Sequence, residues 1–239
     1  MPLLQARGLT RRFGGLIAVN RLDFAIEPGE VLGVIGPNGA GKTTLFSLLT
    51  GFLRPDSGSI LFDGAEVVGR APHRICRLGM VRTFQNLKPF PRLTVRENVL
   101  VGALACASDR GLAAKRADGS LDLLGLAGMS SRLPDEMSIG HLKLLEVARA
   151  LATQPRLLLL DEPFAGLSPA EGAQFSQALG RIRHSDMTIC LIEHVMKAVM
   201  EICERIVVLD HGVKIAEGLP PAIAADPVVV EAYLGKSDD

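Results

Sequence analysis

The chain has 239 residues, with 26 basic and 26 acidic side chains and a hydrophobic fraction of 48%. This composition excludes an intrinsically disordered protein, because such chains lack the apolar residues needed to build a core. The formal net charge of zero argues against a nucleic-acid partner bound over a broad basic surface.

No segment of the sequence is expected to enter or cross a membrane. The first residues, Met1–Gln5, lack the basic-then-apolar pattern of a signal peptide. No apolar run approaches the roughly 18 residues that span a bilayer. We therefore expect a cytoplasmic protein. The four cysteines have neither metal-ligand nor disulfide spacing, which favours free thiols.

The N-terminal region predicts short antiparallel strands, followed by a strand, a loop and a helix. Apolar and β-branched runs cover residues 3–6, 16–19 and 22–26. Residues 31–35 form an unbroken apolar run typical of a buried strand, and residues 43–50 have a helical pattern that ends at Gly51. A glycine-rich loop connects these two segments.

The middle of the chain changes from strand to helix patterns. Residues 59–62 predict a strand and residues 72–78 a short helix. Residues 93–152 then show helical patterns with few β-branched runs. Thr94 and Glu97 have the spacing of a capping box, which marks a helix start. We interpret this stretch as a helical insertion.

Strand patterns resume after the insertion. They cover residues 157–160, 187–192, 205–209 and 213–216. Residues 220–235 have a helical pattern, and residues 236–239 are expected to fray. The alternation of strands and helices favours an α/β fold with a mainly parallel sheet, an N-terminal antiparallel β subdomain and an inserted α-helical subdomain.

The glycine-rich loop fits the phosphate-binding pattern G-x-x-x-x-G-K-[ST]. It comprises Gly36, Pro37, Asn38, Gly39, Ala40, Gly41, Lys42, Thr43 and Thr44. Between a buried strand and a helix, such a loop turns its backbone N–H groups towards an anion. Lys42 can reach the β- and γ-phosphates, and the Thr43 hydroxyl can bind Mg²⁺. The loop therefore predicts a P-loop NTPase core.

Two carboxylates follow the apolar run 157–160. Asp161 and Glu162 come at the carboxyl end of a predicted strand, where open α/β sheets bind their ligands. Asp161 is suited to hold metal-bound water, and Glu162 to polarise the water that attacks the γ-phosphate. An acidic helix cap is the alternative interpretation, and the phosphate loop disfavours it because that loop needs a metal partner.

With these two motifs, the sequence resembles the nucleotide-binding subunit of an ABC transporter over nearly its whole length. The resemblance implies that adenine stacks on Phe13. It also implies that Gln85, within the segment Arg82–Asn86, contacts Mg²⁺ and the attacking water, and that His194 holds the γ-phosphate. Taken alone, Phe13 would be typical of a core residue and His194 of a structural histidine.

Residues 137–141 stand where this family has its Leu-Ser-Gly-Gly-Gln signature. The resemblance implies that Ser138, Gly140 and His141 contact ATP held by a partner subunit, and that Ser168 lies in the D-loop. The sequence departs from the family pattern at four positions, which are Ile139, His141, Ser168 and Val195.

The resemblance implies an ATPase subunit that dimerises around two ATP molecules, as a homodimer or with a related subunit. Such a subunit drives a separate transmembrane permease and lies peripherally on the cytoplasmic face of the membrane. Residues 1–85 and 153–239 would form the nucleotide-binding core with its β subdomain, and residues 86–152 the helical signature subdomain. Segments 82–87, 90–95, 97–99 and 192–194 look most like the ATPase subunits of branched-chain amino acid importers.

Other functions are alternatives to this one. Importers of urea or other amide-like solutes have similar ATPase sequences. A P-loop kinase would need an acceptor pocket and a lid, and a GTPase would need an Asn-Lys-x-Asp guanine-binding motif. Neither is visible in the sequence. An ABC ATPase acting on DNA or ribosomes would need a coiled-coil insertion or two cassettes. A regulatory module that binds ATP without hydrolysing it remains an alternative function, because Ile139, His141 and Ser168 depart from the family pattern.

Overall fold

The computed structural model describes residues 1–183 and 187–234. The fraying expected for residues 236–239 lies outside the described residues. Within them, none of the helices is both long enough and apolar enough to span a bilayer.

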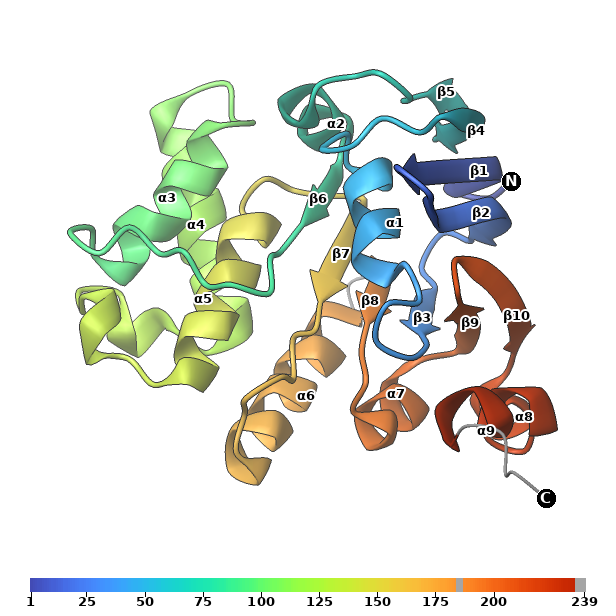
Figure 1. Cartoon of the computed structure of the whole chain (residues 1–239). Coiled ribbons are helices and arrows are strands. Elements are labelled where there is room, and N and C mark those ends of the chain that lie inside the picture. Colours follow the sequence, from blue (N-terminus) through green and yellow to red (C-terminus); the bar gives the residue numbers. More distant parts are fainter. Residues whose placement is uncertain (184–186, 235–239) are drawn as a thin grey trace.

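A four-stranded antiparallel sheet lies on one side of the molecule (Figure 1). Its strands, in spatial order, are β2 (Leu16–Ile26), β1 (Leu4–Phe13), β4 (Ser57–Phe62) and β5 (Ala65–Glu66). The antiparallel pairing expected near the N-terminus is confirmed. The separation of residues 16–19 from 22–26 is wrong, because both runs belong to β2. A bulge accommodates the polar residues between them, where Arg21 has a φ of 46°.

A six-stranded, mainly parallel sheet forms the centre of the molecule. The strands, in spatial order, are β10 (Val213–Gly218), β9 (Arg205–Asp210), β3 (Val31–Ile35), β8 (Thr188–Ile192), β7 (Leu157–Asp161) and β6 (Met80–Arg82). Only β10 runs antiparallel to its neighbour among these described strands.

Strand β7 explains why its sequence is a continuous apolar run. Leu157 and Leu159 pack into the core shared with α1 (Lys42–Leu49) and the antiparallel sheet. Leu158 and Leu160 face the opposite core, which the helical insertion and α6 (Pro169–Arg183) cover. A strand buried on both faces requires apolar residues at every position, and its carboxyl end is thereby held rigidly between two layers.

The helical insertion forms a separate group of helices beside the central sheet (Figure 1). Its elements are α3 (Val95–Leu104), α4 (Arg110–Leu124), the 3₁₀ turns η1 (Ala127–Met129) and η2 (Pro134–Glu136), and α5 (Ile139–Leu151). The capping box at the start of α3 is confirmed. The Glu97 N–H donates to Thr94 Oγ1 at 3.2 Å, and the Thr94 N–H donates to Glu97 Oε2 at 2.7 Å.

The remaining helices cover the central sheet and its C-terminal hairpin. They are α2 (Pro72–Leu78), α6, α7 (Met196–Ile202), α8 (Pro220–Ala224) and α9 (Pro227–Leu234). The helical pattern expected over residues 220–235 corresponds to two helices, α8 and α9, within the described residues. Asp226 precedes Pro227, which lacks an N–H and disfavours helical backbone at the residue before it. The chain therefore ends one helix and begins another at this point.

Candidate functional site

The phosphate loop joins β3 to α1 and is packed tightly from both sides. Gly36 has a φ of +149°, and a Cβ there would lie 2.0 Å from the carbonyl oxygen of Leu209. Gly41 has a φ of +97°, and a Cβ there would lie 2.1 Å from the carbonyl oxygen of Ala18. Only glycine fits such positions. Strands β9 and β2 therefore fix the shape of the loop.

Lys42 is buried at the first position of α1. Its Nζ donates to the carbonyl oxygens of Gly36 at 2.5 Å and Pro37 at 2.8 Å. Burial lowers the pKa of Lys42, whereas the nearby carboxylates of Glu162 and Asp161 favour its charged form. The structure thus brings the predicted lysine and the two predicted carboxylates together.

Asp161 is buried at the carboxyl end of β7 and forms an ion pair with Arg82. Arg82 Nη2 donates to Asp161 Oδ2 at 2.5 Å, and Arg82 Nη1 donates to Ser47 Oγ at 3.0 Å. The guanidinium also lies over the rings of Phe46 and Phe84. Arg82 was not predicted as a site residue. Arg82 binds Oδ2 of Asp161, and Oδ1 takes no part in this ion pair.

Glu162 has a backbone conformation that is rare for a residue with a side chain. Its φ is +48°, and its N–H donates to the carbonyl oxygen of Ile192 at 2.9 Å. Lys143 Nζ donates to the carbonyl oxygen of Glu162 at 2.9 Å, and Gln85 Nε2 donates to Glu162 Oε2 at 2.7 Å. Strained backbone of this kind concentrates at functional sites. Lys143 was absent from the predicted site.

His194 completes the group of side chains at the carboxyl ends of β7 and β8. Its Nδ1 lies 3.9 Å from Oε2 of Glu162 and 3.9 Å from Oε2 of Glu193. Gln85, Glu162 and His194, which we call the carboxyl-end cluster, were all predicted and lie together. Glu193 was not predicted as a site residue.

The residues predicted to bind a metal have the ligand chemistry that suits Mg²⁺. Thr43 offers a hydroxyl, Asp161 a carboxylate and Gln85 an amide oxygen, and Mg²⁺ prefers such oxygen ligands. In residues 1–183 and 187–234, no group of three His, Cys, Asp or Glu side chains could hold a metal. A metal here therefore needs phosphate oxygens or water to complete its coordination, as is usual for Mg²⁺.

Phe13 ends β1 and does not pack into either core. Its side chain is 43% exposed, and the guanidinium of Arg11 lies 4.8 Å from the ring centroid. This exposure removes the interpretation of Phe13 as a core residue. Adenine stacking on Phe13 remains a prediction.

The predicted signature residues surround the N-terminus of α5. Ser138 caps the helix, with the His141 N–H donating to Ser138 Oγ at 3.4 Å. The Gly140 N–H donates to Glu171 Oε1 at 3.0 Å, and a Cβ on Gly140 would lie 2.9 Å from the Glu171 side chain. Among the described hydrogen bonds and ion pairs, none joins these residues to the phosphate loop.

Glu171 connects the signature to the predicted D-loop within one chain. Its Oε2 accepts the Ser168 N–H at 3.0 Å and the Ser168 hydroxyl at 2.8 Å. Hydrogen bonds from Ser168, and then from Gly140 and Ser138, lower the pKa of Glu171 to about 2. Ser168 and Glu171 have the spacing of a capping box, which is a signal that could have identified Glu171 from sequence.

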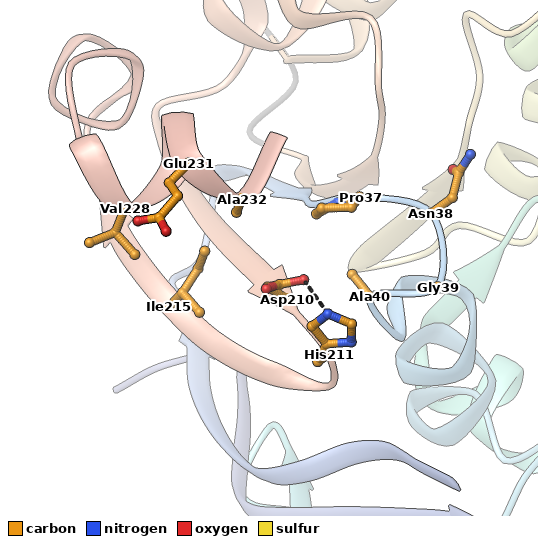
Figure 2. A pocket seen from close by; sticks show the side chains of 10 residues that line it. All are labelled: Pro37, Asn38, Gly39, Ala40, Asp210, His211, Ile215, Val228, Glu231 and Ala232. Carbon is orange, nitrogen blue, oxygen red and sulfur yellow. Dashed lines mark ion pairs between the residues drawn. The ribbon is translucent and has the colours of Figure 1, made fainter. Parts of the chain in front are cut away.

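A cavity of about 450 Å³ lies between the phosphate loop, the β9–β10 hairpin and α9 (Figure 2). Asp210 and Glu231 line it, and Asp210 pairs with His211 at 3.8 Å. Two carboxylates make this an unfavourable place for phosphate groups. Nearby, burial raises the pKa of Tyr233, and a hydrogen bond from the backbone of Gly36 opposes that shift. Helix α9 thus contacts the phosphate loop.

The sequence also matches known families and proteins. Residues 19–165 match the family described as ABC transporter, and residues 213–239 match the one described as branched-chain amino acid ATP-binding cassette transporter. The high-affinity branched-chain amino acid transport ATP-binding protein LivG of Escherichia coli (strain K12) is 41% identical to this chain. That alignment covers 99% of each protein.

Two solved structures resemble the fold. One is the ADP conformation of an ATP-binding cassette of an ABC transporter, with a TM-score of 0.91 and 30% identity over 99% of this chain and 100% of that one. The other is a dimeric, post-hydrolysis ATP-binding cassette bound to ADP and Pi. It has a TM-score of 0.79 and 23% identity over 91% of this chain and 98% of that one.

Proposed function

Because this chain belongs to the ABC transporter family, we propose that it hydrolyses ATP to drive uptake of branched-chain amino acids through a separate membrane permease. The observation that carries the proposal is the carboxyl-end cluster, which lies beside Lys42 and the phosphate loop. The solute is inferred from the printed function of LivG and from the match over residues 213–239.

The phosphate loop and Lys42 are proposed to bind the phosphates of ATP. In the structure, Lys42 Nζ donates to two carbonyl oxygens of its own loop. Phosphate oxygens can replace these acceptors, and charge-assisted hydrogen bonds to them are stronger than bonds to a neutral carbonyl. The exposed ring of Phe13 is proposed to stack on the adenine.

Thr43, Gln85 and Asp161 are proposed to hold Mg²⁺. When bound, the ion stabilises the negative charge on the phosphates during transfer. Arg82 binds Asp161 through Oδ2, so this carboxylate keeps one orientation and Oδ1 is directed away from that bond. Arg82 is therefore proposed as a positioning residue for Asp161.

Glu162 is proposed to accept, on its carboxylate, a proton from the water that attacks the γ-phosphate. Gln85 donates a hydrogen bond to Glu162 Oε2 and so orients that carboxylate. His194 lies within reach of the same carboxylate and is proposed to donate a hydrogen bond to the γ-phosphate. These three side chains come from the segments that directly follow β6, β7 and β8 of the central sheet.

Ser138, Gly140 and His141 are proposed to complete the site of a second subunit, with Ser168 at the contact between the two. The signature residues make no described hydrogen bond to the phosphate loop of their own chain. The N-terminus of α5 is a suitable place for a γ-phosphate. The partner is a second copy or a related ATPase subunit. We also propose that the chain has two parts. Residues 1–85 and 153–239 form the nucleotide-binding core with its β subdomain, and residues 86–152 form the helical signature subdomain.

The segment around Gln85 is proposed to contact the permease on the cytoplasmic face of the membrane. Phe84 and Phe90 flank this segment and are 43% and 40% exposed. Phe52 packs edge-on against Phe84, with ring centroids 5.4 Å apart. Exposed aromatic side chains grouped in this way are typical of an interaction surface.

Solute uptake tests the proposed function. Cells that lack this chain but keep its transport partners should regain uptake of radiolabelled leucine when the wild-type chain is supplied. The Lys42→Ala variant should not restore uptake, because it lacks the cation beside the β- and γ-phosphates. Restored uptake of urea with no effect on leucine, isoleucine or valine would instead support the alternative solute.

A further inference from the structure

We propose that Glu193 is a positioning residue that fixes His194 against the segment carrying Glu162. This inference rests on the proposed function of His194 at the γ-phosphate. Glu193 itself has no place in that function, and its side chain is fully buried, with 0% exposure.

The carboxylate of Glu193 bonds to two segments at the carboxyl ends of neighbouring strands. Oε1 accepts the N–H of Phe164 at 2.6 Å. Oε2 accepts the N–H of His194 at 2.9 Å and that of Val195 at 3.2 Å. One side chain therefore connects the backbone of His194, after β8, to a residue two positions beyond Glu162, after β7.

Among the described residues, few other contacts fix the short segment between β8 and α7. Val195 is the N-cap of α7 but makes no side-chain capping bond. The side chain of His194 is half-exposed, so packing constrains its ring weakly. The two N–H bonds to Glu193 Oε2 therefore determine where the backbone places the His194 ring relative to Glu162.

Charges around Glu193 make a buried carboxylate acceptable at this position. A buried carboxylate is costly unless hydrogen bonds and an opposite charge stabilise it. Lys143, which is also buried, supplies that charge. Burial lowers the pKa of Lys143, whereas the negative charges of Glu193 and then Glu162 raise it and so favour the charged amine. Burial, followed by Glu193, raises the pKa of Cys203 to about 12, which keeps that neighbour neutral.

The Glu193→Gln variant separates positioning from simple support of the fold. Glutamine has the same size as glutamate, but its amide NH₂ is a donor. That NH₂ must face either the N–H of Phe164 or the N–H groups of His194 and Val195. At least one of the two segments then loses its acceptor. We expect kcat for ATP hydrolysis to fall roughly 10-fold or more, while KM for ATP changes less than about twofold because the phosphate loop is untouched.

A double-mutant cycle with His194→Ala tests whether Glu193 acts through His194. If it does, Glu193→Gln should cause little further loss in the His194→Ala background, measured as the single-turnover rate. Multiplicative losses in the double variant would overturn the inference. If His194→Ala alone keeps the wild-type rate, the proposed function of His194 fails instead, so the two failures are distinguishable.

Glu30→Gln provides the matched control. Glu30 is another buried glutamate, which accepts the Glu27 N–H at 2.9 Å and pairs with Arg205 at 2.7 Å, outside the carboxyl-end cluster. The rate losses caused by Glu30→Gln and by His194→Ala should multiply in the double variant, because the two residues act independently. If Glu193→Gln does not fold, Glu193→Asp enters the same cycle: it keeps the charge, but its shorter side chain cannot span both segments. Independent losses with Glu193→Asp would likewise overturn the inference.

Discussion

At the residue scale, Glu171 carries a charge whose effect on stability can be measured. Its pKa is about 2, compared with 4.5 for the unperturbed side chain. The folded state therefore favours the ionised form. This contribution is fully present above about pH 4.5 and is lost as the pH falls towards 2.

We expect Glu171→Gln to lower stability near neutral pH and to flatten its dependence on pH between about 5 and 3. Urea denaturation over that range measures the effect. Glu201→Gln is the control, because the carboxylate of Glu201 lies 4.0 Å from Lys197 at the exposed surface of α7. A Glu171→Gln variant with the same pH dependence as the wild type would show that the bonds to Ser168 and Gly140 do not stabilise the native state.

Arg82 and Lys143 were missed for the same physical reason. Arg82 is 79 positions from Asp161, and Lys143 is 19 positions from Glu162. Lys42, Thr43, Asp161 and Glu162 could be predicted because a local spacing and a flanking strand define their chemistry. Contacts made across the fold leave no such local pattern, and only the packing of the elements reveals them.

At the element scale, the close approach of α3 and α5 depends on Gly102. A Cβ on Gly102 would lie 2.3 Å from the carbonyl oxygen of Arg149. We expect Gly102→Ala to destabilise the protein by about 1–3 kcal/mol, since the two helices must move apart. Gly119→Ala on α4 is the matched control, with no atom within 4 Å of its new Cβ.

Urea denaturation should show that Gly119→Ala is neutral or stabilising by up to ~1 kcal/mol, because alanine favours a helix over glycine. Equal stability changes in the two alanine variants would contradict the close contact between α3 and α5. A loss of ATPase activity without a change in stability would point to a different role for Gly102.

Helices and strands with a continuous apolar run or a clear cap were predicted well. Some of the others could be located only in the structure. Strand β3 and helix α2 have the predicted bounds. Neither β6 nor α7 was predicted, because both are short. Helix α6 was not predicted either, although it is long and its buried residues follow the helical spacing i, i+3, i+4 and i+7. Those residues are Phe175, Ala178, Leu179 and Ile182.

At the scale of the whole molecule, the family, the fold class and the ATPase activity expected from the sequence are confirmed. The phosphate loop lies between the two sheets, and the signature lies on the helical insertion. We propose that Glu162 promotes hydrolysis and that ATP joins two such molecules through their signature residues.

Light scattering of the Glu162→Gln variant tests this claim most directly. Glutamine keeps the shape but cannot accept the proton, so hydrolysis should fall on the order of 10²-fold or more while ATP still binds. The variant should therefore have twice the subunit mass in Mg²⁺-ATP and return towards the monomer in ADP. Adding Ser138→Arg should prevent that dimer, whereas Ser131→Arg, at an exposed serine nearby, should not. Normal turnover by Glu162→Gln, or ATP bound to a monomer, would contradict the account.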